Sequence, residues 1–500
     1  MLKRTSFALA AMTVMTAGAG AAAEPSGPYL ESATLPIRVF YGDDTAAAAP
    51  DILAEAEAMW AAEIDGLGFA PPLRQVGVDD TVQEGLDLVL DATLPGVATY
   101  DVEGNNPDTA TADCPTVGYV NPTYMTTEEM LEMTVIHILN HGSLHAVDCI
   151  EPPSPSYDMF AVATEVTVMG PGHMYWMMSE LPAFQAHPGF SLDQMSMAEA
   201  FYAYGSALYL LFLDEVYGDA DGAILPAVWA LAAQDGNITS WTGGACEADV
   251  ENEPDFLDAV AASLDAHGSS FDEAFVLFTE YRFFIGADDD GAHWADVADW
   301  GGGEVARDTT LTVADLPLAG GAPASEIAEY GSSYVEIDPA GLPSPQAATI
   351  TFAGNPAKTW AASLFLVPAE GAATIVPIAL DADQAGAAEI EDASAWSRMV
   401  LAVANLGDGD HDADAMDWST IDGDYAYSIA TPGFGDGEDA GVDGGDADSD
   451  TDADTDGDTD TDADADGGAD AGQGAGSSGC GCSAISRPAP TALLAALFAA

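Results

Sequence analysis

Two histidines spaced four residues apart are the clearest chemical signal in the sequence. The stretch 135–141 reads Val-Ile-His-Ile-Leu-Asn-His, so His137 and His141 fall on one helix face, where their rings could bind one metal ion. Zinc peptidases use this spacing with a Glu directly after the first His, which accepts a proton from the attacking water. Ile138 occupies that general-base position here. Because isoleucine accepts no proton, and losing a general base costs about two to four orders of magnitude in rate, the pattern predicts a zinc site with impaired catalysis.

Several segments of the chain resemble one family. Residues 137–141 match the His-Glu-Phe-Asn-His motif of the gluzincin-type zinc metalloproteases found among myxobacterial exported proteins, apart from the Glu. The resemblance covers most of residues 35–430 and implies a zincin-like first domain followed by a β-domain. The other matching segments are 56–60, 66–71, 181–184 with His187 and Pro188, Tyr204 with Gly205, and 278–286.

The resemblance also implies a third zinc ligand, a Glu on the helix that follows the histidine pair. Direct alignment of residues 160–165 puts Ala163 at that position. Glu165 lies two residues further on, which turns it about 200° around a helix. Glu165 is therefore the third metal ligand only if the register of the helix shifts, and Glu180 is a second candidate.

His145 continues the same helix face. One ion bound by both His137 and His145 is not expected, because these residues would lie about 12 Å apart along the helix axis and zinc ligand atoms lie about 2.0–2.3 Å from the ion. His141 with His145 is an alternative pair. The alternative to any metal site is that these histidines are buried helix residues with satisfied hydrogen bonds.

Other side chains leave the chemistry open. An active peptidase would need a substitute base, for which the candidates are Glu132, Glu165 and Glu180. A tyrosine of a later helix could line a cleft and stabilise an oxyanion, or all of them could be core aromatics; these residues are Tyr202, Tyr204 and Tyr209.

The N-terminus indicates export. Lys3 and Arg4, the apolar residues 7–14 and the small residues 21–23 predict a signal peptide over residues 1–23.

The C-terminus predicts a solvated stalk and a surface anchor. Residues 436–470 contain 16 acids, so a disordered acidic stalk is expected over 433–476. Cys480 and Cys482 in a Gly-Cys-Gly-Cys motif, with a mostly apolar run up to residue 500, resemble the MYXO-CTERM sorting signal, which we assign to 477–500. That resemblance implies outer-membrane anchoring through the tail and location at the cell surface; an extracellular location is the alternative.

Calcium is an alternative cofactor in the stalk. Asp452, Asp454, Asp456 and Gly457 are spaced as at the start of a calcium loop, but the downstream Glu of an EF-hand is absent. In a repetitive Asp sequence such a match also arises by chance.

The remaining cysteines predict one disulfide. Cys114, Cys149 and Cys246 lie in the part expected to fold, and an exported protein permits one bridge with one thiol left over. The sequence leaves the pair open.

Charge excludes some partners. The chain has 9 Lys and Arg against 84 Asp and Glu, a net charge of −75. Phosphate backbones require clustered basic residues, so a nucleic-acid partner is excluded. A peptide or a surface polymer remains a candidate partner. Either a saline habitat, in which salt screens the repulsion, or a composition bias of the lineage would account for the charge.

Hydrophobic patterns predict an α+β fold. Strands are expected at 37–41, 86–90 and 117–120, and a helix with a capping box at Thr126 and Glu129 should carry the histidines. Further helices are expected at 160–169, 197–216, 224–233 and 271–285. Strand-length runs then follow at 309–313, 333–337, 348–352, 363–367, 374–380, 399–403 and 425–429.

These patterns predict a mixed α/β domain at 24–308, a β-sandwich at 309–432 and the disordered stalk. The family resemblance implies that the first of these domains is zincin-like. The leading functional hypothesis is a surface-anchored, metalloprotease-like pseudoenzyme. The alternatives are an active zinc endopeptidase with a substitute base, and an adhesive or structural surface protein without a metal.

Overall fold

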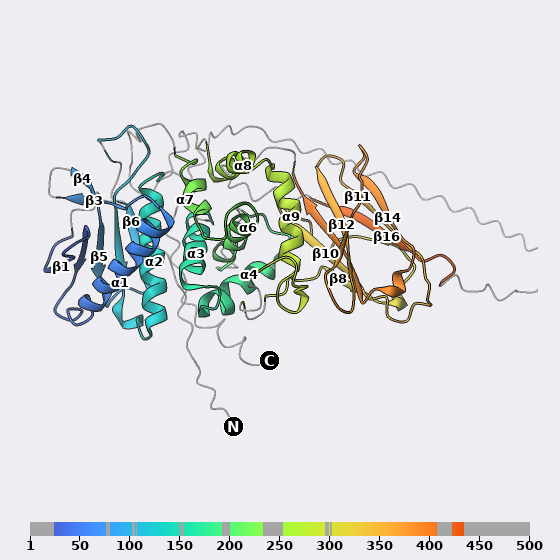
Figure 1. Ribbon diagram of the computed structural model, residues 1–500, viewed down its shortest axis with the longest axis horizontal. Helices are drawn as coiled ribbons and strands as arrows, with labels where there is room; N and C mark the ends of the chain where they lie inside the picture. The colour runs from blue at the N-terminus through green and yellow to red at the C-terminus, as the bar shows by residue number, and fades with distance from the viewer. Residues whose placement is uncertain are drawn as a thin grey trace, which may run out of the picture.

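The computed structural model describes residues 25–76, 81–102, 106, 108–149, 151, 155–192, 201–233, 254–295, 300, 303–407 and 423–434. The predicted signal peptide, the calcium-like repeat, the sorting motif with Cys480 and Cys482, and Cys246 lie outside these residues, as does nearly all of the predicted stalk. The described chain mixes helices and sheets, as expected for an α+β protein, and forms an elongated body with three successive parts (Figure 1).

The first part is a five-stranded sheet covered by helices. Its strands are β1 (Tyr29–Glu31), β2 (Ile37–Phe40), β5 (Leu86–Leu90), β7 (Thr116–Val120) and β6 (Ala98–Val102), in that spatial order. Strands β2, β5 and β7 are parallel, whereas β1 and β6 are antiparallel to their neighbours. The three predicted strands are confirmed. A small hairpin of β3 (Leu73–Val76) and β4 (Thr81–Glu84) lies beside this sheet.

Two helices pack against this sheet through a shared hydrophobic core. They are α1 (Ala49–Ala62) and α2 (Glu128–His145), and their apolar side chains form one cluster with those of the strands. Gly118 in β7 allows this close packing, because a Cβ atom there would collide with Ile138 and Leu88. A buried ion pair of Arg38 and Asp87 joins β2 to β5 at a nitrogen–oxygen distance of 2.5 Å.

The second part is helical and lies in the middle of the molecule (Figure 1). It contains α3 (Pro155–Met169), η3 (Trp176–Glu180), α4 (Leu181–Gln185), α5 (Tyr202–Gly205), α6 (Ala207–Tyr217), α7 (Ile224–Trp229), α8 (Phe256–Ala266) and α9 (Phe271–Phe283). The single helix predicted over 197–216 is wrong within the described residues, because the chain forms two helices there. The break follows Gly205, whose backbone packs so closely on Glu180 that a Cβ atom would collide with the Glu180 carbonyl oxygen.

The third part consists of two β-sheets in which most neighbouring strands are antiparallel. One has the order β13 (Thr374–Pro377), β12 (Trp360–Val367), β15 (Arg398–Asn405), β10 (Ser332–Ile337) and β8 (Thr309–Leu311). The other has the order β14 (Ala385–Ile390), β11 (Ala348–Gly354), β16 (Tyr425–Ala430) and β9 (Leu318–Gly321). Side chains of both sheets share one buried hydrophobic cluster. Each of the seven strand-length runs predicted in this region overlaps an observed strand.

Helix α9 joins the helical part to the sheets. Phe283 and Phe284 pack with Tyr334 and Phe365 in a cluster of their own. The Tyr334 hydroxyl donates a hydrogen bond to the carbonyl of Thr279 in α9 at 2.8 Å. The segment at residues 306–308 contacts both parts, because the Ala306 amide donates to the Gln185 carbonyl at 2.8 Å and the Asp308 amide donates to the Tyr334 carbonyl at 2.9 Å. Among the described residues, no helix has both the length and the hydropathy needed to cross a lipid bilayer.

Candidate metal centre

Helix α2 carries the histidine pair and is capped at its start by Thr127. The Thr127 hydroxyl accepts a hydrogen bond from the Met130 amide at 3.1 Å. The predicted capping box at Thr126 is therefore displaced by one residue. Glu129 does not close a box but accepts a hydrogen bond from the amide of Met174 at 2.6 Å, which fixes α2 to the segment after α3.

Three ligand-type atoms converge between α2 and α3. The Nε2 atoms of His137 and His141 lie 3.0 Å apart. Asp158, in the first turn of α3, places its Oδ1 atom 3.5 Å from the His141 nitrogen and 3.7 Å from the His137 nitrogen. The histidines are 0 % and 1 % exposed and the aspartate is 9 % exposed. This group could hold a metal ion, although Asp158 was not predicted from the sequence.

Glu165 lies on the other side of the His137 ring. Its Oε1 atom is 2.5 Å from His137 Nδ1, and both side chains are buried. Asp158 and Glu165 are seven residues apart on α3, so both face α2 about two turns from each other. The carboxylate that meets the two Nε2 atoms is therefore Asp158, whereas Glu165 meets His137 as a hydrogen-bonding partner.

Ile138 faces the sheet. Its side chain is 2 % exposed, belongs to the core cluster under α2, and occupies the space above Gly118. Position 138 is thus a packing position in this chain, and a Glu there would bury its carboxylate against β7.

The substitute bases considered from the sequence are placed differently. Burial is the main cause that raises the pKa of Glu55 on α1, and the charge of nearby Glu132 raises it further. Glu180 lies with Glu165 and His173 in a second buried group behind His137.

Aromatic rings enclose the histidines. Tyr100 stacks on His141 with ring centroids 4.4 Å apart, and Tyr204 stacks on His137 at 5.9 Å. The ring of His145 is clamped edge-on by Tyr157 at 4.3 Å, and burial lowers its pKa to about 3, so it is neutral.

Of the three tyrosines considered from the sequence, Tyr204 stacks against a histidine of the site. Tyr202 donates hydrogen bonds to the carbonyl oxygens of Phe190 and Ser191, and Tyr209 packs among phenylalanines.

The electrostatics of the three converging groups are coupled. Burial acts to lower the pKa of His137, but the nearby carboxylates of Asp158 and Glu165 outweigh it and raise this pKa to about 10. Burial lowers the pKa of His141 to about 4. Burial would raise the pKa of Asp158, but both histidines stabilise its carboxylate, so the pKa lies below its ordinary value.

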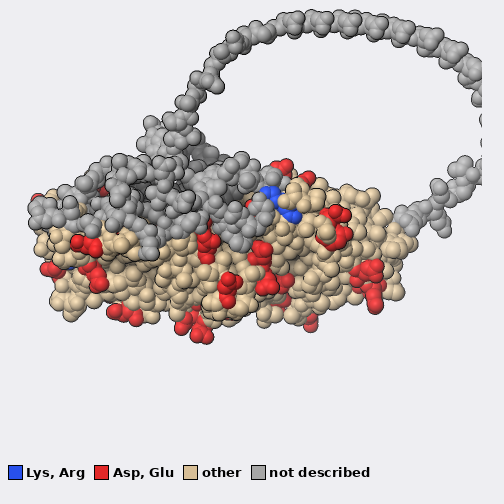
Figure 2. Space-filling view, turned by 90° about the horizontal axis from the view of Figure 1, so that it is seen from above, with Lys and Arg blue, Asp and Glu red and all other residues tan. Residues whose placement is uncertain are grey.

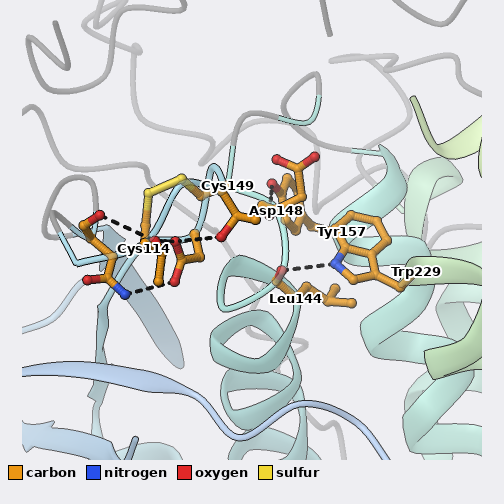
Figure 3. The surroundings of a disulfide bond; sticks show 10 residues. Cys114, Leu144, Asp148, Cys149, Tyr157 and Trp229 are labelled. Atoms are coloured by element: carbon orange, nitrogen blue, oxygen red, sulfur yellow. Dashed lines mark hydrogen bonds between the residues drawn. A yellow bond between two sulfur atoms is a disulfide. The ribbon is translucent and has the colours of Figure 1, made fainter. Parts of the chain in front are cut away.

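A disulfide fixes the C-terminal end of α2. Cys114 is bonded to Cys149, and this settles the pairing that the sequence left open (Figure 3). The Cys114 amide donates to the His145 carbonyl at 2.9 Å. Trp229 donates its indole N–H to the Leu144 carbonyl at 2.9 Å (Figure 3), so the last turn of the histidine helix is held from two sides.

No protein-family model matches the sequence. No curated protein matches it either. A proposal about function therefore rests on the geometry of the site at His137, His141 and Asp158.

Proposed function

We propose that this protein is an exported, surface-anchored relative of zincins that binds zinc through His137, His141 and Asp158 and is impaired in peptide hydrolysis. In this proposal residues 24–308 form the zincin-like domain and residues 309–432 form a β-sandwich. The acidic stalk and the tail with Cys480 and Cys482 place the folded part outside the outer membrane.

The observation that carries the proposal is the convergence of three buried ligand atoms from two helices. Two imidazole nitrogens 3.0 Å apart repel each other unless a proton or a cation lies between them. Asp158 Oδ1 is buried and has no hydrogen-bond partner, which is costly for a carboxylate oxygen unless another group binds it.

The donor set fits zinc better than calcium. Two imidazoles and one carboxylate are ligands typical of zinc sites, whereas calcium takes six to eight oxygens. Zinc ligands of the histidine type usually bond a carboxylate through their second ring nitrogen, and Glu165 supplies such a partner to His137. When bound, zinc would supply Lewis-acid chemistry at this position.

Two observations at α2 support impaired peptide hydrolysis. Ile138 belongs to the core, and Glu165 is already engaged with His137. The histidines are almost fully buried, which supports a binding or structural role for the ion over rapid turnover.

The experiment measures zinc content and peptide cleavage for the full-length protein. Asp158→Asn and His141→Ala should each lose one equivalent of zinc, whereas His267→Ala, at an exposed histidine directly after α8, should lose none. Chelator-sensitive cleavage by the wild type at a rate typical of zinc peptidases would contradict the impaired state and favour the active-enzyme alternative. Absence of retained zinc would favour the adhesive alternative.

A further inference from the structure

A second group of ligand-type side chains lies behind the first. Glu165, His173 and Glu180 each offer one atom, and these atoms all lie within 4.8 Å of one another. The three residues are 1 %, 4 % and 1 % exposed. The group is therefore buried and not part of a surface patch, and none of its members belongs to the His137–His141 pair.

The backbone around the group is fixed from three directions. Glu165 is on α3, and Glu180 ends the π-helical turn η3. His173 lies between them, next to Met174, whose amide is held by Glu129 of α2. Gly205 of α5 packs directly on the Glu180 carbonyl. Turns of the π type occur often at functional sites.

Each member keeps a buried atom without a hydrogen-bond partner. These atoms are Glu165 Oε2, His173 Nε2 and Glu180 Oε2. The Trp176 amide donates to Nδ1 of His173 at 3.5 Å, a distance at which a hydrogen bond is weak. Nε2 can act as the ligand atom once the ring proton leaves it, or once that proton moves to Nδ1 and this weak bond is lost. Buried polar atoms without partners are rare in folded proteins, and three in one place point to a missing ligand.

We propose that Glu165, His173 and Glu180 bind a second divalent transition-metal ion. Two carboxylates and one imidazole form a harder donor set than that of the first site, and it suits Mn²⁺ and Zn²⁺. Glu165 links the two sites, because its Oε1 atom bonds His137 Nδ1, while its unpartnered Oε2 is the atom that we assign to the second ion. The alternative occupant is a proton shared by the two carboxylates, since both cannot be ionised so close together without a cation.

The test is the number of zinc ions that the full-length chain retains. Metal-free protein is loaded with Zn²⁺ and desalted in high salt with excess Ca²⁺, which removes ions held loosely by the acidic surface. Metal content is then measured by plasma mass spectrometry. We expect two equivalents for the wild type, one each for Glu180→Gln and His173→Ala, one for Asp158→Asn, and two for the control His267→Ala.

The outcomes separate this proposal from the proposed function. A single ion that is lost in Asp158→Asn and kept in Glu180→Gln would overturn the second site and leave the first intact. A single ion with the reverse pattern would support the second site and overturn the first. No retained ion would overturn both. Should the variants fail to fold, the anomalous scattering of zinc in wild-type crystals locates each ion directly and decides between the same outcomes.

Discussion

The two imidazoles of α2, which meet edge-on, share one proton when no metal is bound. The pKa of His137 is raised to about 10, since Asp158 and Glu165 outweigh the effect of burial. His141, whose pKa burial lowers to about 4, is neutral and accepts from His137 across 3.0 Å. At neutral pH a metal must therefore displace the proton of His137.

Zinc binding to the first site should release one proton. In His173→Ala, where the first site remains, the apparent Kd for zinc should fall about tenfold for each pH unit between about pH 6 and pH 8. Calorimetry in two buffers of different ionisation enthalpy measures both the proton release and the Kd. A Kd that is independent of pH over this range would show that His137 is already deprotonated.

A buried acid next to the site should make stability depend on pH. Glu63 is fully buried and accepts a hydrogen bond from Asn140 at 3.1 Å, and burial raises its pKa to about 8. The folded-state pKa exceeds the unfolded value, so the stabilisation by the bound proton is complete below about pH 4.5 and is lost as pH rises through 8. The free energy of unfolding should thus fall by roughly 1.4 kcal/mol per pH unit inside this window.

Glu63→Gln should remove that dependence. The stability advantage of Glu63→Gln over the wild type should grow from pH 5 to pH 8 in urea unfolding, while Glu57→Gln, a partly exposed position on α1, should follow the wild type. Parallel curves for Glu63→Gln and the wild type would contradict a protonated Glu63.

At the residue scale, the sequence predicts which residues of one helix lie side by side. It does not predict which residues of two different helices meet. His137 and His141 could be paired because a helix fixes the geometry of residues four apart. Asp158 could not be found in this way, since its position depends on how α3 packs against α2. The available signal was the spacing of Asp158, which lies seven residues before Glu165 and therefore on the same face of that helix.

Helix α2 depends on anchors at both ends. Thr127 caps its first turn, and Cys114, Cys149 and Trp229 hold its last turn. The disulfide closes a loop with a sequence separation of 35, and this loop contains the whole of α2.

Removing the disulfide should destabilise the fold and loosen the site. For a loop of this length, chain entropy predicts a loss of about 4 kcal/mol in the free energy of unfolding. The double variant Cys114→Ser with Cys149→Ser should show this loss in denaturant titration, together with a weaker zinc affinity. Cys246→Ser, a cysteine substitution that leaves this bridge intact, serves as the control. Equal stability of the double variant and the control would rule out the proposed clamp.

At the element scale, hydrophobic runs predicted most strands and helices but not their interruptions. Strands β9 and β14 were missed because Leu-Ala-Gly-Gly and Ala-Gly-Ala-Ala-Glu-Ile have few β-branched residues. The turn η3 and the break after Gly205 were missed because both arise from contact between segments distant in the sequence.

Across the described part of the chain, the few arginines are engaged with other groups, whereas most of the exposed charged side chains are acidic. All five arginines of the described chain make interior or ion-pair contacts; they are Arg38, Arg74, Arg282, Arg307 and Arg398. Arg282 donates to Phe184 and Gln185 at 2.6 and 3.0 Å and so ties α9 to α4. Figure 2 shows acidic side chains spread over the visible surface with little basic surface between them.

This distribution predicts that salt stabilises the protein. Because few cations are left on the surface to pair with the acids, raising NaCl from low to molar concentration should raise Tm by on the order of 5 °C or more. Differential scanning calorimetry measures the shift, and sucrose at equal osmolality controls for exclusion effects. An unchanged or lower Tm in NaCl would contradict the account of surface repulsion.

The central claim is that His137, His141 and Asp158 bind one zinc ion. Anomalous diffraction at the zinc edge, from crystals of the full-length wild type, tests it most directly. We predict a peak about 2.0–2.3 Å from both Nε2 atoms and from an Asp158 oxygen. A map with no zinc there, in which His137 and His141 are joined by a hydrogen bond alone, would contradict it.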